Sequence, residues 1–234
     1  MHMENEPLPI SDQTLPPAAS ATQRAYLAIR RMIVVGELKP GEKLKIDGLK
    51  TVLDTGASPI REALSLLTSD QLVERIDQRG FRTASTNREN FNEILMLRCA
   101  LEEMALRQSI ANASGDWENH LVICHHRMVR EPRDNIEAFE DRHKAFHMAL
   151  LNNCDSPILL KFCNQLYDLN IRYRYLAVLA LEYRKRDVSR EHTNIMEAAI
   201  ERDADLASER LLNHYHQTGA FLTGLLTNSE TGKD

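Results

Sequence analysis

Four histidines in the second half of the chain have the spacing of metal ligands. His143 and His147 are four residues apart, so on a helix their rings lie one turn apart on the same face. His192 lies near the start of a later predicted helix, and His214 follows in the next one. A turn near Asp203 would make these two helices antiparallel neighbours, so their rings can meet inside a bundle. One histidine on an apolar helix is usually a core residue, but four at these spacings predict a divalent metal site.

A second group of polar residues, in the stretch ASPIREALSLL, is of the types that read DNA. If the apolar residues of this stretch face a core, Ser58, Arg61 and Ser65 share the outward face of the helix. The planar fork of an arginine matches O6 and N7 of guanine, for about 1–3 kcal/mol of discrimination. Ser58 and the free N–H groups at a helix start suit phosphate oxygens.

The elements around this stretch follow the order of a winged helix-turn-helix. Three helices are predicted, over residues 21–36, 46–54 and 58–69. Ser58 is the expected N-cap of the third helix, and Pro59 its first helical residue. Two short β-like runs follow, over 72–76 and 81–83, and they predict a hairpin.

The turn of this hairpin has the composition of a wing. Gln78 supplies an amide, Arg79 a positive charge, and Gly80 allows close backbone approach, which together suit an adjacent minor groove. Residues 21–85 hold 11 Lys/Arg against 8 Asp/Glu, whereas the rest of the chain holds 18 against 26. A basic N-terminal part joined to an acidic C-terminal part indicates two functions on one chain. The net charge of −5, taken alone, argues against a nucleic-acid partner.

The second half of the chain is helical in period throughout. Helices are predicted over 89–111, 116–130, 134–153, 156–181, 186–201 and 203–226. The fold class is therefore mostly α, with an N-terminal winged helix-turn-helix and a C-terminal antiparallel bundle. The expected divisions are a flexible N-terminal segment over 1–20, the winged helix over 21–84, a linker over 85–90 and the bundle over 91–228.

Several classes of protein are disfavoured by composition. No apolar stretch has the roughly 18 to 20 residues needed to cross a membrane, and the acidic, proline-rich start lacks the features of a signal peptide. The four cysteines show no CxxC spacing, so neither a thiolate zinc site nor a redox motif is indicated. We therefore expect a cytoplasmic protein without a membrane partner.

Residues 21–84 resemble the DNA-binding domain of the GntR family of transcription factors. The resemblance is carried by GELKPGEKL, ASPIREALSLL and LVERIDQRGF, in that order, over residues 21–84. It implies that the predicted reading helix and wing bind double-stranded DNA. Family members usually have an arginine before the Ser/Thr-Pro step, where this chain has Ala57, so one base contact of the family is expected to be missing.

The second half is similar to the effector domain of the FadR subgroup, called the FCD domain. The matching stretches are LRCALEEMAL, HKAFHMAL, EHTNIMEAAIERDADLA and LLNHYH. The resemblance implies a metal held by an aspartate and three histidines, and His147, His192 and His214 match those histidines. His143 stands where the aspartate is expected, and Asp141 cannot replace it because it is about 120° off the face of His147.

His143 leaves two alternatives open. It can be a fourth ligand, which gives a site whose ligands cancel none of the metal charge and which attracts an anion. It can instead hydrogen-bond nearby while three histidines hold the metal. Zinc is the expected ion, with nickel or manganese as the other candidates.

Arg98 is the expected contact for an effector. The FCD resemblance implies that this arginine points into the pocket, where a guanidinium suits a carboxylate. The alternative is an intrahelical ion pair with Glu102, worth only about 0.3–0.5 kcal/mol if exposed. Arg172, Tyr173 and Tyr175 are weaker candidates.

Together these features predict a homodimeric, ligand-responsive DNA-binding regulator, expected to be a repressor rather than an enzyme. It would bind a near-palindromic operator and sense a small carboxylate through the metal-containing pocket. The alternatives are a metal-dependent hydrolase and a regulator whose metal is purely structural.

Overall fold

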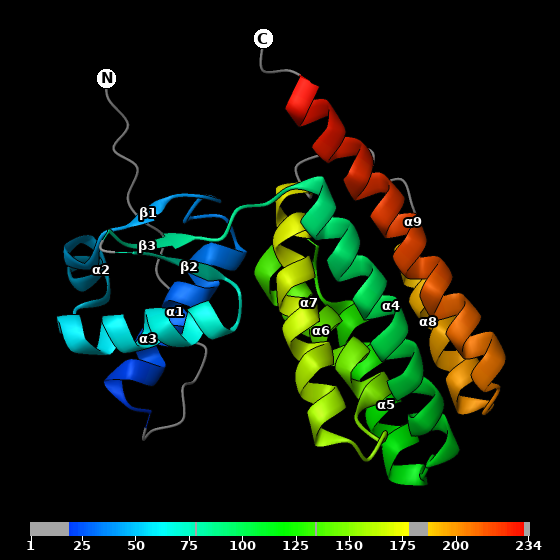
Figure 1. Ribbon diagram of the computed structural model, residues 1–234. Helices are drawn as coiled ribbons and strands as arrows, with labels where there is room; N and C mark the ends of the chain where they lie inside the picture. Colours follow the sequence, from blue (N-terminus) through cyan, green and yellow to red (C-terminus); the bar gives the residue numbers. More distant parts are fainter. Residues whose placement is uncertain (1–18, 78, 134, 178–186, 232–234) are drawn as a thin grey trace, which may run out of the picture.

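The computed structural model describes residues 19–77, 79–133, 135–177 and 187–231, with only the backbone given for 176–177 and 225–231. The flexible segment expected over 1–20 therefore falls almost wholly outside the described residues. Gln78 of the predicted wing also falls outside them, as do residues 178–186. The expected class, a mostly helical protein with a small sheet, is confirmed (Figure 1).

The N-terminal part is a winged helix-turn-helix with one strand more than the sequence predicts. Its helices are α1 (Ala21–Val34), α2 (Ile46–Leu53) and α3 (Ala57–Ser69). Its strands are β1 (Lys43–Leu44), β2 (Val73–Ile76) and β3 (Gly80–Thr83), antiparallel in the order β1-β3-β2. The two residues of β1 are too few to give a periodic signal, so only the β2–β3 hairpin was predictable.

The start of α3 differs from the expected one. Gly56, not Ser58, is the N-cap, and it offers no side-chain hydrogen bond. Pro59 therefore lies third in the helix rather than first, which costs nothing because N–H groups in the first turn have no helical acceptor. The inward face is as predicted: Ile60, Ala63, Leu64 and Leu67 are fully buried.

Among the described residues, the C-terminal part is a bundle of six helices. They are α4 (Arg88–Ala111), α5 (Gly115–Arg130), α6 (Ile136–Leu151), α7 (Pro157–Ala177), α8 (Val188–Ile200) and α9 (Ala204–Thr231). Side-chain caps begin several of them: the Asn87, Ser114 and Asn135 side chains accept from the backbone three residues on. α4 packs against α9 and α7, α5 against α6, and α8 against α9 (Figure 1). Because α4 begins at Arg88, the last three residues of the expected linker are helical.

The two parts are in contact and share apolar packing. Phe91, Leu169 and Tyr173 of the bundle belong to the same cluster of buried side chains as the core of the winged helix. α1 lies against α7, and Arg172 donates to the carbonyl oxygen of Ala84 at 2.7 Å. Among the described helices, none is long and apolar enough to cross a membrane.

Candidate functional site

The four predicted metal ligands meet in the interior of the bundle. α6 supplies His143 and His147, α8 supplies His192, and α9 supplies His214. One nitrogen of each ring lies within 4.8 Å of the others, and every ring is buried. The predicted turn between α8 and α9 brings His192 and His214 together, with their ring centroids 4.6 Å apart.

The spacing of the ring nitrogens fits a metal ion. The Nε2 atoms of His143, His147 and His192 are 3.1, 3.2 and 3.3 Å from one another. A Zn²⁺ ion with Zn–N bonds of about 2.0–2.1 Å requires tetrahedral ligands to be about 3.3 Å apart. The three nitrogens therefore already have the separation that such an ion imposes.

Hydrogen bonds to the Nδ1 atoms of His147 and His214 leave the Nε2 atoms, which face the centre of the cluster, able to bind a cation. The Nδ1 atom of His147 is 3.0 Å from the hydroxyl of Tyr215, which donates its own proton to Glu102. The Tyr215 oxygen must then accept from Nδ1–H of His147, so the Nε2 lone pair is free. Nδ1 of His214 is 2.8 Å from a carboxylate oxygen of Glu191, which likewise accepts. Such outer partners orient metal-binding histidines.

Burial keeps three of the four rings neutral. Desolvation lowers the pKa of His143, His147 and His192 well below the usual range for histidine. The Arg174 cation and the neighbouring imidazoles lower these pKa values further. These three rings are therefore unprotonated at neutral pH, as metal ligands must be.

His143 has surroundings unlike those of the other three. A guanidinium nitrogen of Arg174 lies 2.9 Å from its Nδ1 and 3.1 Å from its Nε2. The hydroxyl of Tyr167 is 2.5 Å from Nδ1, and Arg174 also pairs with Glu140 at 2.9 Å. Either of the two predicted roles for His143 is compatible with these contacts.

Arg98 is in the interior, and it is also ion-paired. Its Nε donates to Glu102 at 2.7 Å and one Nη donates to Asn170 at 2.9 Å, while its guanidinium carbon lies 4.4 Å from the ring centre of Tyr215. Burial by itself lowers the pKa of Arg98, but the Glu102 carboxylate more than offsets it and the pKa is raised. The pair is thus internal to the bundle, not the exposed one considered from the sequence.

A small cavity joins Arg98 to the histidine cluster. It has a volume of about 10 Å³ and is lined by Arg98, His143, Arg174 and His214, among others. This is about the space of one water molecule. A carboxylate could enter only if the surrounding helices or side chains moved.

Sequence reasoning missed three residues beside the histidines. Tyr167 and Arg174 are seven residues apart on α7, which places them two turns apart on one face. Glu140 precedes His143 by three residues on α6. That spacing was the available signal, but without knowing which face of α7 is inward it could not be used.

The residues singled out near Arg174 have other partners. Arg172 contacts Ala84 and so connects the bundle to the residue that follows β3. The Tyr173 hydroxyl donates to Asn90 of α4 at 2.8 Å, a contact within the bundle. Tyr175 lines a cavity between the bundle and α1.

The predicted DNA-reading residues lie on the surface of the winged helix. Ser58, Arg61 and Ser65 are all exposed on α3. Ser65 donates to the carbonyl oxygen of Arg61 at 3.0 Å, and Ser58 is 3.4 Å from Glu62. Arg79 and Gly80 are exposed at the turn between β2 and β3, where Gly80 has φ +95°. Glycine adopts this left-handed backbone at no steric cost.

Comparison with known proteins agrees with both halves of the structure. Residues 21–82 match the model of the bacterial regulatory proteins of the gntR family, and residues 93–217 match the FCD domain. The chain is 33% identical over 216 residues to the HTH-type transcriptional regulator BphR of Paraburkholderia xenovorans, covering 89% of this chain and 85% of that protein. It is 32% identical over 198 residues to the HTH-type transcriptional repressor GlaR of Escherichia coli, covering 81% of this chain and 90% of GlaR.

Solved structures show the same fold. Escherichia coli McbR/YncC superposes with a TM-score of 0.78 at 20% identity, covering 88% of this chain and 99% of that one. A GntR regulator from Rhodococcus has a TM-score of 0.71 at 19% identity, again with 88% and 99% coverage.

These matches confirm the family resemblance, and they confirm a regulator rather than an enzyme, because the family and the relatives consist of transcription regulators. The chain belongs to the GntR family of bacterial transcription regulators, as a DNA-binding member that carries an FCD domain.

Proposed function

We propose that this regulator is a homodimeric repressor of the FadR subgroup that senses a small carboxylate through a divalent metal ion. The observation that carries the proposal is the buried set of His143, His147, His192 and His214, whose inner nitrogens have the spacing of metal ligands. The similarity to GlaR, which is named a repressor, supports repression rather than activation. When bound, the metal would supply a Lewis acid that attracts a carboxylate oxygen.

The charge of the site favours an anionic effector. Neutral imidazoles cancel none of the charge of a divalent ion, and the Arg174 cation, which pairs with Glu140, lies 3.1 Å from His143. Arg98, at the other side of the small cavity, is the candidate for the second carboxylate contact. To bind the ligand, the Arg98 guanidinium would have to donate hydrogen bonds to both Glu102 and the ligand carboxylate. Zinc suits an all-nitrogen ligand set, with nickel and manganese as the other candidates.

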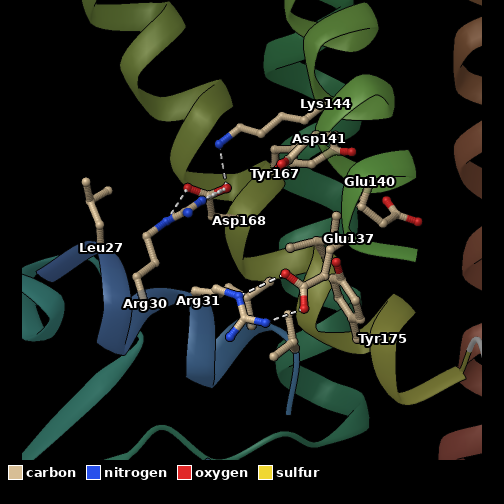
Figure 2. A pocket seen from close by; sticks show the side chains of 13 residues that line it. Leu27, Arg30, Arg31, Glu137, Glu140, Asp141, Lys144, Tyr167, Asp168 and Tyr175 are labelled. Carbon is tan, nitrogen blue, oxygen red and sulfur yellow. Dashed lines mark hydrogen bonds and ion pairs between the residues drawn. The ribbon is translucent and has the colours of Figure 1, made fainter. Parts of the chain in front are cut away.

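α6, which holds two of the histidines, and its neighbour α7 also hold the DNA-binding domain. Figure 2 shows Arg30 of α1 reaching Asp168 of α7, which Lys144 of α6 contacts as well. The two contacts to Asp168 are 2.5 and 2.6 Å. Arg31 of α1 pairs with Glu137 of α6 at 2.5 Å. The winged helix is thus attached by ion pairs to α6 and α7.

These attachment points are adjacent to the cluster. Lys144 follows His143 directly on α6, and Asp168 follows Tyr167, which contacts His143. A carboxylate does not fit the cavity as it stands, so its binding must displace side chains of α4, α6, α7 or α9, which line it. We propose that this displacement moves α1 and lowers DNA affinity. A ligand has this effect only if it binds one arrangement more tightly than the other.

On DNA, α3 would lie in the major groove, with Arg61 on base edges and Ser58 and Ser65 near the backbone. Arg79 and Gly80, together with Gln78, would follow the minor groove as a wing. Two such winged-helix domains, related by the twofold axis of a dimer, require a near-palindromic operator. Ala57 removes one contact, so the operator is expected to differ at that base from those of relatives with arginine there.

The test is an effector screen on a selected operator. The operator is first enriched from random double-stranded DNA with zinc-loaded protein. Mono-, di- and tricarboxylates of two to six carbons are then titrated while DNA binding is followed by fluorescence anisotropy. We expect at least one carboxylate to weaken binding about tenfold or more. If none changes the affinity although the protein contains stoichiometric zinc, the metal is structural and the sensing role is wrong.

A further inference from the structure

A cavity at the junction of the winged helix and the bundle is separate from the histidine cluster. α1, the end of α3 and α7 line it, and it shares no lining residue with the small cavity beside the histidines. Its volume is about 200 Å³. An engineered cavity of about 150 Å³ is enough to hold benzene. The junction cavity therefore has room for a small molecule of about six to eight non-hydrogen atoms.

One face of α7 forms one wall of the cavity. Lys161, Asn164 and Asp168 follow one another at three or four residues, so their side chains lie in a row along the helix. Gln165, in the same wall, donates from its amide to a backbone carbonyl oxygen at the end of α3, at 3.4 Å. Asp168 pairs with Arg30 of α1 at 2.5 Å (Figure 2). These two contacts connect the wall directly to the winged helix.

The winged helix forms the second wall, and it supplies a carboxylate. Tyr26 of α1 and Asp70, at the end of α3, both line the cavity, together with the buried side chain of Leu72. The Tyr26 hydroxyl donates to one carboxylate oxygen of Asp70 at 2.7 Å. The other oxygen accepts no hydrogen bond from any residue that the structure describes. It is therefore available to a cation in the cavity.

Two opposite charges in this cavity are not paired with each other. In the described part of the chain, the Lys161 ammonium forms no ion pair, and neither does the Asp70 carboxylate. The remaining charges are already satisfied, because Asp168 accepts from both Arg30 and Lys144. The cavity therefore offers an ammonium on one wall and a carboxylate oxygen on the other, each without a charged partner.

We propose that the junction cavity binds a small amino acid, a zwitterion with one ammonium and one carboxylate. The ligand carboxylate would bind Lys161 and the amide of Asn164, and the ligand ammonium would bind the second oxygen of Asp70. The carbon atoms between them would lie against Leu72 and the ring of Tyr26. A ligand with a single charge would satisfy only one of the two walls, so it should bind less tightly.

This site goes beyond the proposed function, because it uses none of the four histidines. A bound amino acid would contact α7 and the winged helix at once. It would therefore favour the arrangement in which the two parts have their present contact over any arrangement in which they separate. A regulator with both sites would respond to two ligands, one inside the bundle and one at the junction.

The first experiment compares zwitterions with singly charged analogues. Amino acids of two to six carbons, from glycine to 6-aminohexanoate, with the ammonium on the α or the terminal carbon, are titrated into zinc-loaded protein by calorimetry. Unbranched carboxylates and amines of the same lengths are titrated beside them. We expect at least one amino acid to bind about tenfold or more tightly than its carboxylate and its amine. Equal binding by either analogue, or no binding by any amino acid, would refute the zwitterion site.

The histidine cluster must be excluded as the place of binding. The same titrations are repeated with His192→Ala, which is expected to lack the metal. The amino acid should bind this variant as tightly as it binds wild type. Binding that disappears in His192→Ala belongs to the metal site and would overturn the junction site. Carboxylate sensing at the metal is tested by the effector screen, so either proposal can fail without the other.

The last experiment removes each charge of the cavity in turn. Lys161→Met and Asp70→Asn should each weaken binding of the tightest amino acid about tenfold or more, since each loses a charge-assisted hydrogen bond. Lys50→Met, exposed on α2, and Asp116→Asn, exposed on α5, are the matched controls and should bind as wild type does. Circular dichroism checks the folding of all four variants, and Lys161 is itself exposed, so its substitution should leave the fold intact. Affinity in Lys161→Met or Asp70→Asn equal to that of its control would contradict the site.

Discussion

At the residue scale, the four histidines were predictable and their surroundings were not. His143 and His147 show their relation through helical spacing, and the turn after α8 pairs His192 with His214. Arg174, by contrast, reaches His143 from a helix whose inward face depends on packing between distant parts of the chain. A sequence pattern within α7 cannot supply that information.

Removal of one histidine should remove the metal. His192→Ala deletes one of the closely spaced Nε2 atoms, so zinc per chain should fall and the melting temperature with it, because bound metal stabilises the folded state by mass action. Metal analysis and thermal unfolding measure the two effects. His126→Ala, an exposed histidine on α5, is the control. Equal zinc content in the His192 variant and the control would exclude the site as proposed.

Removal of the arginine on the reading helix should remove operator recognition. Arg61→Ala deletes the guanidinium group that is expected to bind a guanine, and we expect a loss of about 1–3 kcal/mol in binding free energy. Anisotropy titration on the selected operator measures it, with circular dichroism to show unchanged helicity. Arg130→Ala, exposed at the end of α5, has the same change in charge. Sequence-specific binding by Arg61→Ala as tight as by Arg130→Ala would contradict the reading role.

At the element scale, long amphipathic helices were predicted to within a few residues, while short elements were not. α4 was expected over 89–111 and spans Arg88–Ala111. β1 has two residues and exists only because β3 provides its hydrogen-bonding partner. The start of α3 at Ala57 shows the same limit, since Ser58 is a good N-cap by type but the chain enters the helix at Gly56.

The junction between α1 and α7 gives a prediction at this scale. Asp168→Asn leaves Arg30 and Lys144 close together without the carboxylate that they share, so unfolding free energy should fall by about 1–3 kcal/mol. Urea denaturation measures the change, with Glu209→Gln on the exposed face of α9 as the control. The variant should also respond less to the effective carboxylate. An unfolding free energy equal to that of the control would mean that the junction does not stabilise the fold.

At the scale of the whole molecule, the two parts were predictable and their contact was not. The basic front and acidic back indicate two functions, and the polar stretch after residue 84 separates them. The packing of Phe91 and Tyr173 with the core of the winged helix joins segments far apart in the sequence. In the proposed function, this contact is the route by which a ligand in the bundle would influence a helix on DNA.

The most direct measurement is the response of operator affinity to the effective carboxylate, in zinc-loaded wild type and in His192→Ala. Each response is taken relative to the same protein without carboxylate. Wild type should lose about tenfold or more in affinity, and the variant should show no change, because its site no longer holds the metal that binds the ligand. A full response from a His192→Ala protein that contains no zinc would contradict the account.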